Sequence, residues 1–203
     1  IAKNYDSMWT NSEKARIDVN MITDADGNVT DAGNNPVEIE GHATTMTTWY
    51  GTGGIINIGL TTGDSKFTGE FAGAGTQNMW LRNGAVWNNT GIVYNPWSGS
   101  NYISDISSHV TWLHGGNDKS SAGNIIQNSA SDLYIDNLDG CTKLFMEHDL
   151  NYVVPEFAKN PDGSDKVDKD GNKIKNEDAG QKKIFGKLGN VIIAKAHKRE
   201  GKN

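Results

Sequence analysis

Short runs in which apolar and polar residues alternate recur along the chain and predict β-strands. Near the middle, three runs follow one another at intervals of about ten residues, at Asn124–Gln127, Asp132–Asp136 and Thr142–Glu147. β-Branched and aromatic residues occupy the runs, and small polar residues occupy the segments between them. Asn tolerates the left-handed backbone conformation that suits a tight corner. The pattern therefore predicts an all-β protein of short strands joined by tight corners.

The same alternation appears in the flanking parts of the chain. It covers residues 15–20, 37–40, 44–50, 55–60, 66–71, 78–83, 85–89, 109–114, 183–188 and 190–195. Asn83-Gly84 separates two of these runs and is a strong signal for a tight turn, which fits either a hairpin or the corner of a solenoid. No segment has the period of a stable helix.

Two architectures fit these strands: we expect a right-handed parallel β-helix, with a β-sandwich as the alternative. A sandwich requires strict alternation on most strands, because one face of each strand meets a core and the other meets water. In a β-helix, three strands at this spacing would form one rung of about twenty to thirty residues, the size of a solenoid repeat. We predict that Ile126, Ile135 and Phe145, from three successive runs, point into one apolar interior.

Composition divides the chain into three parts. Residues 1–150 carry the predicted rungs and the irregular loops between them, and residues 182–203 carry the final strands and a tail. The part between them, residues 151–181, is rich in Lys, Asp, Asn and Gly and predicts a polar insertion or hairpin. The chain starts at Ile1 without an initiating Met and without a charged and then apolar leader, so we expect it to be a segment of a longer protein.

Charge and cysteine content exclude some classes of protein. The formal net charge of the 203 residues is −6, which argues against nucleic acid as a partner because phosphate binding needs a basic face. Cys141 is the single cysteine, so a disulfide framework within one chain is excluded. No apolar run is long enough to span a bilayer.

The polar residues form no catalytic set, so we expect no catalytic residues and no enzymatic activity. Asp132, Asp136 and Asp139 invite comparison with β-helical polysaccharide-acting enzymes, but those sites need a basic partner, and Arg82 is the only arginine in the middle of the chain. We therefore read the three carboxylates as solvated. Cys141 lacks the His and Asn order of a nucleophilic cysteine.

Metal and cofactor sites are not expected either. The loop from Lys166 to Glu177 resembles a calcium loop, but Lys166 stands where the first carboxylate is needed, so we predict a solvated Asp-Gly turn around Asp168. His109 and His114 are five residues apart, which puts them on opposite faces of a regular strand. No zinc site follows from them.

Aromatic residues are the best candidates for a ligand-binding surface. Trp80, Trp87 and Trp112 lie within predicted strands, so we assign them to core or corner packing. Trp97 lies in an irregular loop, Asn-Pro-Trp-Ser-Gly, with Tyr94 and Tyr102 nearby. Because clusters of exposed aromatic residues on loops mark binding surfaces, we predict ligand binding at Trp97, Tyr94 and Tyr102.

Part of the chain resembles a known family. The segments that carry the resemblance lie between Phe67 and Asp149 and include the motif Trp-Leu-Arg-Asn-Gly-Ala-Val-Trp at 80–87, Val110–Gly116, Ala122–Gln127 and Leu133–Gly140. They are similar to the passenger domains of bacterial autotransporters, and in particular to the large surface adhesins of that family. The resemblance implies a right-handed β-helix exported through the outer membrane. The polar insertion after Pro155 and the segment before Gly51 depart from it.

The functional expectation combines these points. We expect a non-enzymatic segment of a bacterial surface or secreted β-helical adhesin, located outside the cell, that acts as a stalk or as a binding surface for a glycan or a protein. A polysaccharide-acting β-helix enzyme is one alternative. A structural subunit that stacks end to end into fibres is another, because the open ends of a solenoid leave backbone groups unpaired.

Overall fold

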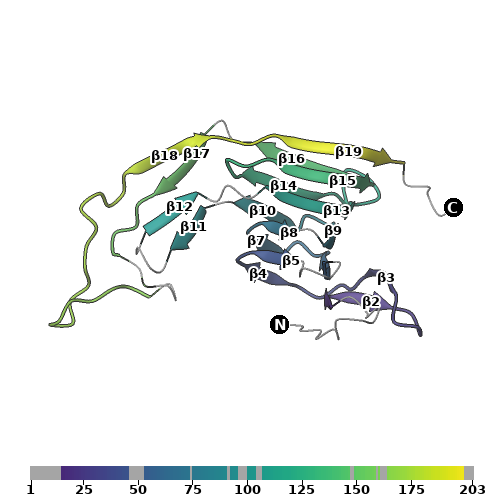
Figure 1. Cartoon of the computed structure of the whole chain (residues 1–203), viewed down its shortest axis with the longest axis horizontal. Coiled ribbons are helices and arrows are strands. Elements are labelled where there is room, and N and C mark those ends of the chain that lie inside the picture. The colour runs from purple at the N-terminus through teal and green to yellow at the C-terminus, as the bar shows by residue number, and fades with distance from the viewer. Residues whose placement is uncertain are drawn as a thin grey trace.

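Two parallel β-sheets dominate the structure (Figure 1). This computed structural model describes residues 15–45, 53–73, 75–90, 92–95, 100–103, 107–146, 149–158, 160 and 164–198, and for 92–95, 100–103, 149–153 and 182–186 it describes the backbone alone. All of its regular elements within these ranges are strands, as the alternating sequence predicted. They include no helix long and apolar enough to cross a bilayer.

The first sheet contains six parallel strands in the order β1-β6-β9-β13-β15-β19. Their bounds are β1 (Arg16–Val19), β6 (Ile55–Leu60), β9 (Thr76–Leu81), β13 (Ser108–His114), β15 (Leu133–Asp139) and β19 (Val191–His197). Each strand pairs with the first-sheet strands that come before and after it in the chain. The sheet therefore grows in one direction along the sequence.

The second sheet contains five parallel strands in the order β4-β7-β10-β14-β16. They are β4 (Glu38–Glu40), β7 (Lys66–Thr68), β10 (Val86–Thr90), β14 (Gly123–Asn128) and β16 (Thr142–Met146). A short parallel pair, β5 (Ala43–Thr45) with β8 (Phe71–Gly73), follows β4 and β7 in the chain. The order again follows the sequence.

The chain alternates between the two sheets. Strands β6, β9, β13 and β15 of the first sheet are followed by β7, β10, β14 and β16 of the second. Asn83 and Gly84 lie between β9 and β10, with φ angles of 53° and 80°. Because β9 and β10 belong to different sheets, this turn is a corner between the sheets and not a hairpin. Asn and Gly suit the corner because both tolerate positive φ.

Apolar side chains from both sheets form one continuous core. On the second sheet, Phe67, Trp87 and Ile125 occupy equivalent positions on successive strands. The rings of Phe67 and Trp87 stack with centroids 6.2 Å apart. On the first sheet, Met79 and Leu113 are opposite each other and fully buried. Parallel pairing thus stacks the interior positions of successive strands on one another.

The predicted interior was correct at one of three positions. Ile135 is 1 % exposed and belongs to the core, as expected. Ile126 and Phe145 do not belong to it: Ile126 is half-buried, and Phe145 is 51 % exposed. They are opposite each other on β14 and β16, and Ile125 takes the interior position instead. Because side chains alternate between faces, this error of one residue reverses the faces of both strands.

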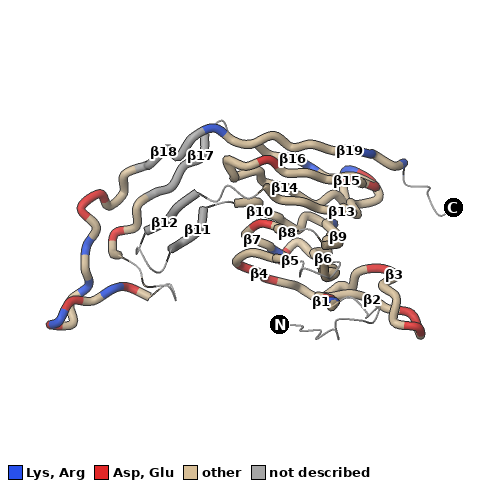
Figure 2. Tube along the Cα trace, in the orientation of Figure 1, with Lys and Arg blue, Asp and Glu red and all other residues tan. Residues whose placement is uncertain are grey.

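Among the described residues, three antiparallel hairpins leave the two sheets. They are β2 (Met21–Thr23) with β3 (Val29–Ala32), β11 (Ile92–Asn95) with β12 (Ser100–Ile103), and β17 (Asp149–Val153) with β18 (Lys182–Lys187). The segment between β17 and β18, here called the excursion (residues 154–181), projects away from the sheets (Figure 1). Figure 2 shows that charged residues gather on the excursion and on the β2–β3 turn and are sparser on the sheet strands.

Candidate functional site

A groove with a volume of about 430 Å³ lies on the outer face of the first sheet, beside the β2–β3 hairpin. We call it the outer groove. The hairpin forms one wall and the sheet strands form the other, with the lining residues Val29, Thr30, Asp31, Asn57, Asn78, Trp80, Arg82 and His114. These residues come from four strands and one corner, so only the folded chain assembles them.

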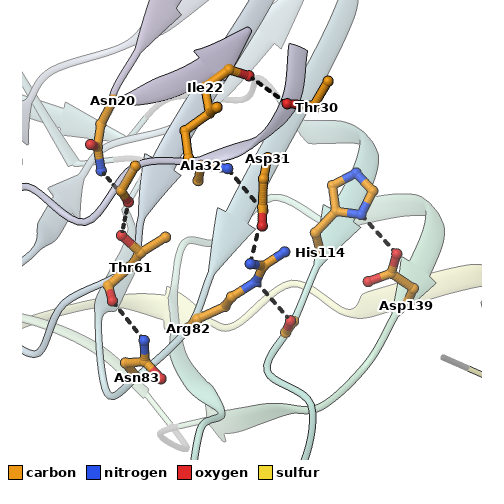
Figure 3. A network of polar contacts seen from close by, with 12 residues as sticks. Asn20, Ile22, Thr30, Asp31, Ala32, Thr61, Arg82, Asn83, His114 and Asp139 are labelled. Atoms are coloured by element: carbon orange, nitrogen blue, oxygen red, sulfur yellow. Dashed lines mark hydrogen bonds and ion pairs between the residues drawn. The ribbon is translucent and has the colours of Figure 1, made fainter. Parts of the chain in front are cut away.

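A glycine allows the hairpin to lie against the sheet. A Cβ atom at Gly59 of β6 would lie 2.8 Å from the Cβ of Ala32 and 2.6 Å from the carbonyl oxygen of Asn20. Asn20 adopts a positive φ of 54° just before β2, and its side-chain amide donates to the carbonyl oxygens of Gly33 and Gly59, at 3.0 and 2.9 Å. The hydroxyl of Thr61 donates to the same carbonyl of Gly33 (Figure 3). The hairpin wall is therefore fixed to the sheet at several points.

An ion pair crosses the outer groove. Nη1 of Arg82, which follows β9, donates to Oδ1 of Asp31 on β3 at 2.9 Å, and Nε of Arg82 donates to the carbonyl oxygen of Gly115 at 3.2 Å (Figure 3). The arginine side chain is 16 % exposed, whereas the aspartate side chain is 48 % exposed. The guanidinium is thus held from two sides, while the carboxylate remains accessible to a ligand.

Aromatic and imidazole rings form a stacked array on the same face. The centroids of Trp80 and His114 are 4.5 Å apart, those of Trp112 and His114 are 5.5 Å apart, and those of Trp112 and His197 are 5.1 Å apart. Nδ1 of His114 lies 2.8 Å from Oδ2 of Asp139, which orients the imidazole (Figure 3). Trp80 is 7 % exposed, so its assignment to packing is confirmed, although of the three tryptophans only Trp87 belongs to the main core cluster. Trp112 is half-buried within the ring array.

A second column of polar side chains runs beside the rings. The amide of Asn78 donates to Oδ1 of Asn57 at 2.8 Å, and the amide of Asn57 donates to Oδ1 of Asp18 at 2.7 Å. The three residues are opposite one another on β1, β6 and β9. Such a ladder fixes the floor of the groove and leaves it rich in hydrogen-bonding groups.

The expectation that His109 and His114 lie on opposite faces was wrong. The buried positions Val110 and Leu113 of β13 are three residues apart and not two, so the alternation is interrupted between them, while the pairing with β15 keeps its register. Both histidines consequently avoid the core, and each contacts a carboxylate of β15. His109 lies 2.9 Å from Asp136.

The three carboxylates singled out in the sequence all have specific partners. Asp136 and Asp139 contact the two histidines of β13. Oδ1 of Asp132 accepts hydrogen bonds from the backbone and side-chain N–H groups of Asn190, at 2.7 and 3.1 Å. Asp136 and Asp139 thus tie β15 to β13, and Asp132 joins the residue before β15 to the residue before β19.

The predicted aromatic site falls mostly outside the described residues. Trp97 lies outside them. The backbones of Tyr94 and Tyr102 belong to β11 and β12, opposite Asn101 and Val93, and their side chains are not described. The prediction of a binding surface at these three residues therefore stays a prediction.

The loop around Asp168 forms the predicted Asp-Gly turn. Oδ1 of Asp168 accepts hydrogen bonds from the backbone N–H groups of Asn172 and Asp170, both at 2.9 Å, and these bonds lower the pKa of Asp168. Gly171 has a φ of 85°. The sequence Asp-Ala-Asp-Gly-Asn at 24–28 forms the same arrangement at the end of the β2–β3 hairpin. Within the described ranges, no group of three or more His, Cys, Asp or Glu side chains could share a metal ion.

The outer groove combines groups of complementary character. A carboxylate only accepts hydrogen bonds, a guanidinium only donates them, and the amides of Asn57 and Asn78 do both. Because Asp31 and Arg82 neutralise each other, the groove lacks the excess positive charge that phosphate or sulfate recognition needs. It suits an uncharged ligand with many hydroxyl or amide groups.

Comparison with known proteins adds no relative. No family model matches the chain, and neither a curated protein nor a solved structure matches it.

Proposed function

We propose that this chain is a right-handed parallel β-helix segment of a bacterial surface or secreted protein, and that it acts as a non-enzymatic stalk and binding surface. The parallel pairing of successive strands in two sheets, with a stacked core between them, supports the β-helix over the sandwich. Parallel crossover connections are right-handed in nearly all proteins, which supports the handedness. The resemblance to autotransporter passenger domains supports the location outside the cell.

The observation that carries the binding function is the outer groove. Its wall is fixed by the contacts of Asn20 and Thr61, and its polar groups are held in place by neighbouring strands. A fixed site loses little conformational entropy when a ligand binds. Hydroxyl groups of a glycan, or amide groups of a protein, would donate to Asp31 and accept from Arg82. Asp136 and Asp139 of β15 support the role as a stalk, because each contacts a histidine of the neighbouring strand β13.

Substitution of Asp31 tests this function. Purified protein is tested for binding to an array of glycans and to bacterial and host cell surfaces, with the release of reducing sugar measured in parallel. Asp31→Ala should weaken binding about tenfold, because a hydrogen bond to a charged group is lost. Asp26→Ala, on the exposed turn of the same hairpin, is the matched control and should bind as the unaltered chain does.

Two results would contradict the proposal. Equal binding by the Asp31→Ala variant and the unaltered chain would remove the outer groove as the binding site. Release of reducing sugar would instead favour the polysaccharide-acting enzyme.

A further inference from the structure

The two sheets end at different levels on the side of β16 and β19. The first sheet has six strands and the second has five, so β19 forms a sixth layer beyond the layer of β15 and β16. Within the described part of the chain, no second-sheet strand follows β19, and no strand pairs with the outer edge of β16 or β19 (Figure 1). This end of the molecule, here called the step, is therefore one strand higher on the first sheet than on the second.

Exposed apolar side chains gather at the step. Leu144 of β16 is equivalent to the core residue Ile125, and Ile193 of β19 is equivalent to the core residue Ile135. Exposed apolar residues beside an open strand edge favour contact with another strand. Five such residues lie on the two strands and are 38–51 % exposed: Leu144, Phe145, Met146, Ile192 and Ile193.

The backbone of β16 directs hydrogen-bonding groups to the open edge. The N–H of Asn124 on β14 donates to the carbonyl oxygen of Ala85 at 2.8 Å, so Asn124 faces the β10 side. Lys143 is equivalent to Asn124 and therefore faces β14. Because the N–H and C=O groups of successive residues point to opposite sides of a strand, those of Leu144 and Met146 point to the open edge.

The backbone of β19 has the same arrangement. The N–H of Leu133 on β15 donates to the carbonyl oxygen of Asn190 at 2.8 Å, so Asn190 faces β15. By the same alternation, Val191 and Ile193 direct their N–H and C=O groups to the open edge of β19. Each strand of the step thus presents backbone groups and an interior apolar side chain at one residue.

A second copy added head to tail cannot close both edges. Strands β1 and β4 belong to one layer, because they pair with β6 and β7 of the next layer. If β1 of the added copy paired with β19, the layer beside β16 would stay empty. If its β4 paired with β16, its β1 would overlap β19.

A copy turned about a two-fold axis closes both edges. Its β19 occupies the empty layer beside β16, and its β16 lies beside β19 of the first copy, so that each step fills the other. First-sheet strands run toward the corner between the sheets and second-sheet strands run away from it, because β15 leads through Gly140 and Cys141 to β16. The facing strands of the two copies are therefore antiparallel.

The directions of the side chains select a register. Directly opposite residues of an antiparallel pair share a face, and a hydrogen-bonded pair needs backbone groups that face each other. Leu144 of one copy and Ile193 of the other meet both conditions. This register covers all five exposed apolar residues and places no lysine opposite a lysine. The remaining pairs are Phe145 with Ile192, Met146 with Val191, Lys143 with Ala194 and Thr142 with Lys195.

A groove lies where Ile192 of the second copy would pack against Phe145. Its volume is about 660 Å³. It is lined by Val86, Asn124, Ile126, Leu144, Phe145 and Met146. An apolar side chain that enters this groove removes apolar surface from water on both copies.

We propose that two copies of this chain form a closed dimer through the step, with β16 of each copy pairing antiparallel with β19 of the other. The partner is a second copy because it supplies the missing strand, the opposite step and the apolar residues in one register. Such a contact is isologous, so it uses both steps and ends at two copies. The net charge of −6 opposes association, but its effect is screened over about 8 Å at physiological salt.

Sedimentation velocity of the full chain over a range of concentrations tests the association. The unaltered chain should pass from monomer to dimer and form no longer species. Leu144→Glu combined with Ile193→Glu should weaken the dimer at least about tenfold, because charges would be buried at the centre of the contact. Val167→Glu combined with Ile174→Glu, on exposed apolar residues of the excursion, changes the net charge equally and should form dimers as the unaltered chain does.

Disulfide formation between copies tests the register. Phe145 and Ile192 form a pair without mutual hydrogen bonds, with Cα atoms about 4.5 Å apart, which a disulfide can span. All the proteins in this test carry Cys141→Ser. A mixture of the Phe145→Cys and Ile192→Cys proteins should form disulfide-linked dimers under mild oxidation at least about ten times faster than either protein alone. A mixture of the Phe145→Cys and Ile174→Cys proteins is the control and should not gain in rate.

Three results would overturn the proposal. One is an unaltered chain that stays monomeric at every concentration, and another is association that continues beyond two copies. The third is equal cross-linking in the test mixture and in the control mixture, which would place β16 of one copy away from β19 of the other. Circular dichroism of each variant establishes that a lost dimer is not a lost fold.

Discussion

At the scale of single residues, Ile135 and Phe145 differ sharply although both are apolar strand residues. Ile135 is 1 % exposed within the core, whereas Phe145 is 51 % exposed on the last strand of the second sheet. Removal of a buried side chain costs its transfer free energy and leaves a cavity. The cost of the same removal at an exposed position is small.

Ile135→Ala should therefore lower the free energy of unfolding by about 2–5 kcal/mol. Phe145→Ala, the matched variant, should lower it by about 1 kcal/mol or less. Urea unfolding followed by circular dichroism measures both. Equal losses in the two variants would contradict the assignment of the core.

At the scale of the elements, a corner can require glycine where its backbone lies close to the backbone of a neighbouring corner. Gly69 has a φ of 148°, and a Cβ atom there would lie 1.7 Å from the carbonyl oxygen of Gly41. Gly63 lies at another corner, where a Cβ atom would lie 3.6 Å from the nearest atom, the carbonyl oxygen of Asn83. Only the first position requires glycine.

Gly69→Ala should destabilise the protein by about 3 kcal/mol or more, because the clash and the unfavourable φ add. Gly63→Ala should stay within about 1 kcal/mol of the unaltered chain. Thermal unfolding measures both variants. A large loss of stability in both would indicate that the corners tolerate no substitution, whereas a loss in Gly69→Ala alone would confirm the specific contact at Gly69.

The Asp-Gly turns give a prediction about metal. The backbone N–H groups of Asn172 and Asp170 already occupy one oxygen of Asp168, and the corresponding bonds occupy Asp24 in the β2–β3 turn. We expect millimolar calcium and EDTA to give the same Tm. A rise of Tm with calcium would show a bound ion, because a ligand that binds only the folded state must stabilise it.

The local pattern predicted the strands well and their faces less well. Ile125 and Ile126 are adjacent, so either could point into the core. The polar neighbour on the same face as Ile125, which is Gln127, has to be buried with it. Gln127 is fully buried, with its Oε1 accepting from the side chain of Asn89 at 2.7 Å. A buried polar pair of this kind breaks the rule that interior positions are apolar, because the hydrogen bond offsets the cost of burial.

The outer groove could not be predicted from the sequence for a related reason. Asp31, Arg82 and His114 are far apart in the chain and meet only because the hairpin folds over Gly59. The available signals in the sequence were the small residue Gly59 and the residue Asn20, which tolerates positive φ. Both residue types are common in turns that make no such contact. The interrupted alternation of β13, which keeps both His109 and His114 away from the core, has no local signature at all.

At the scale of the whole molecule, the parallel register predicts that one complete turn of the chain can be removed. Deletion of residues 108–132 would place β15 next to β9 and β16 next to β10, with Leu138 opposite Met79 and Leu144 opposite Trp87. A β-helix should tolerate this change because each strand contacts only its neighbours. A sandwich would lose strands that its topology requires.

The shortened chain should give a β-sheet spectrum and a cooperative thermal transition. The control deletes residues 108–131, one residue fewer, so that Asp132 takes the place of Leu133 and every following side chain reverses its face. That variant should not fold. Loss of folding in both would argue against the β-helix.

The excursion also has a consequence for the order in which the protein folds. Most first-sheet strands can pair with a strand that the chain has only recently completed, but β19 pairs with β15 only after the β17–β18 hairpin and the excursion have intervened. Closing a longer loop costs more entropy, and long-range pairing is slow. Folding should therefore proceed from the earlier strands and end with the docking of β19, and until then Leu133 and Ile135 remain open to any other strand that reaches them first.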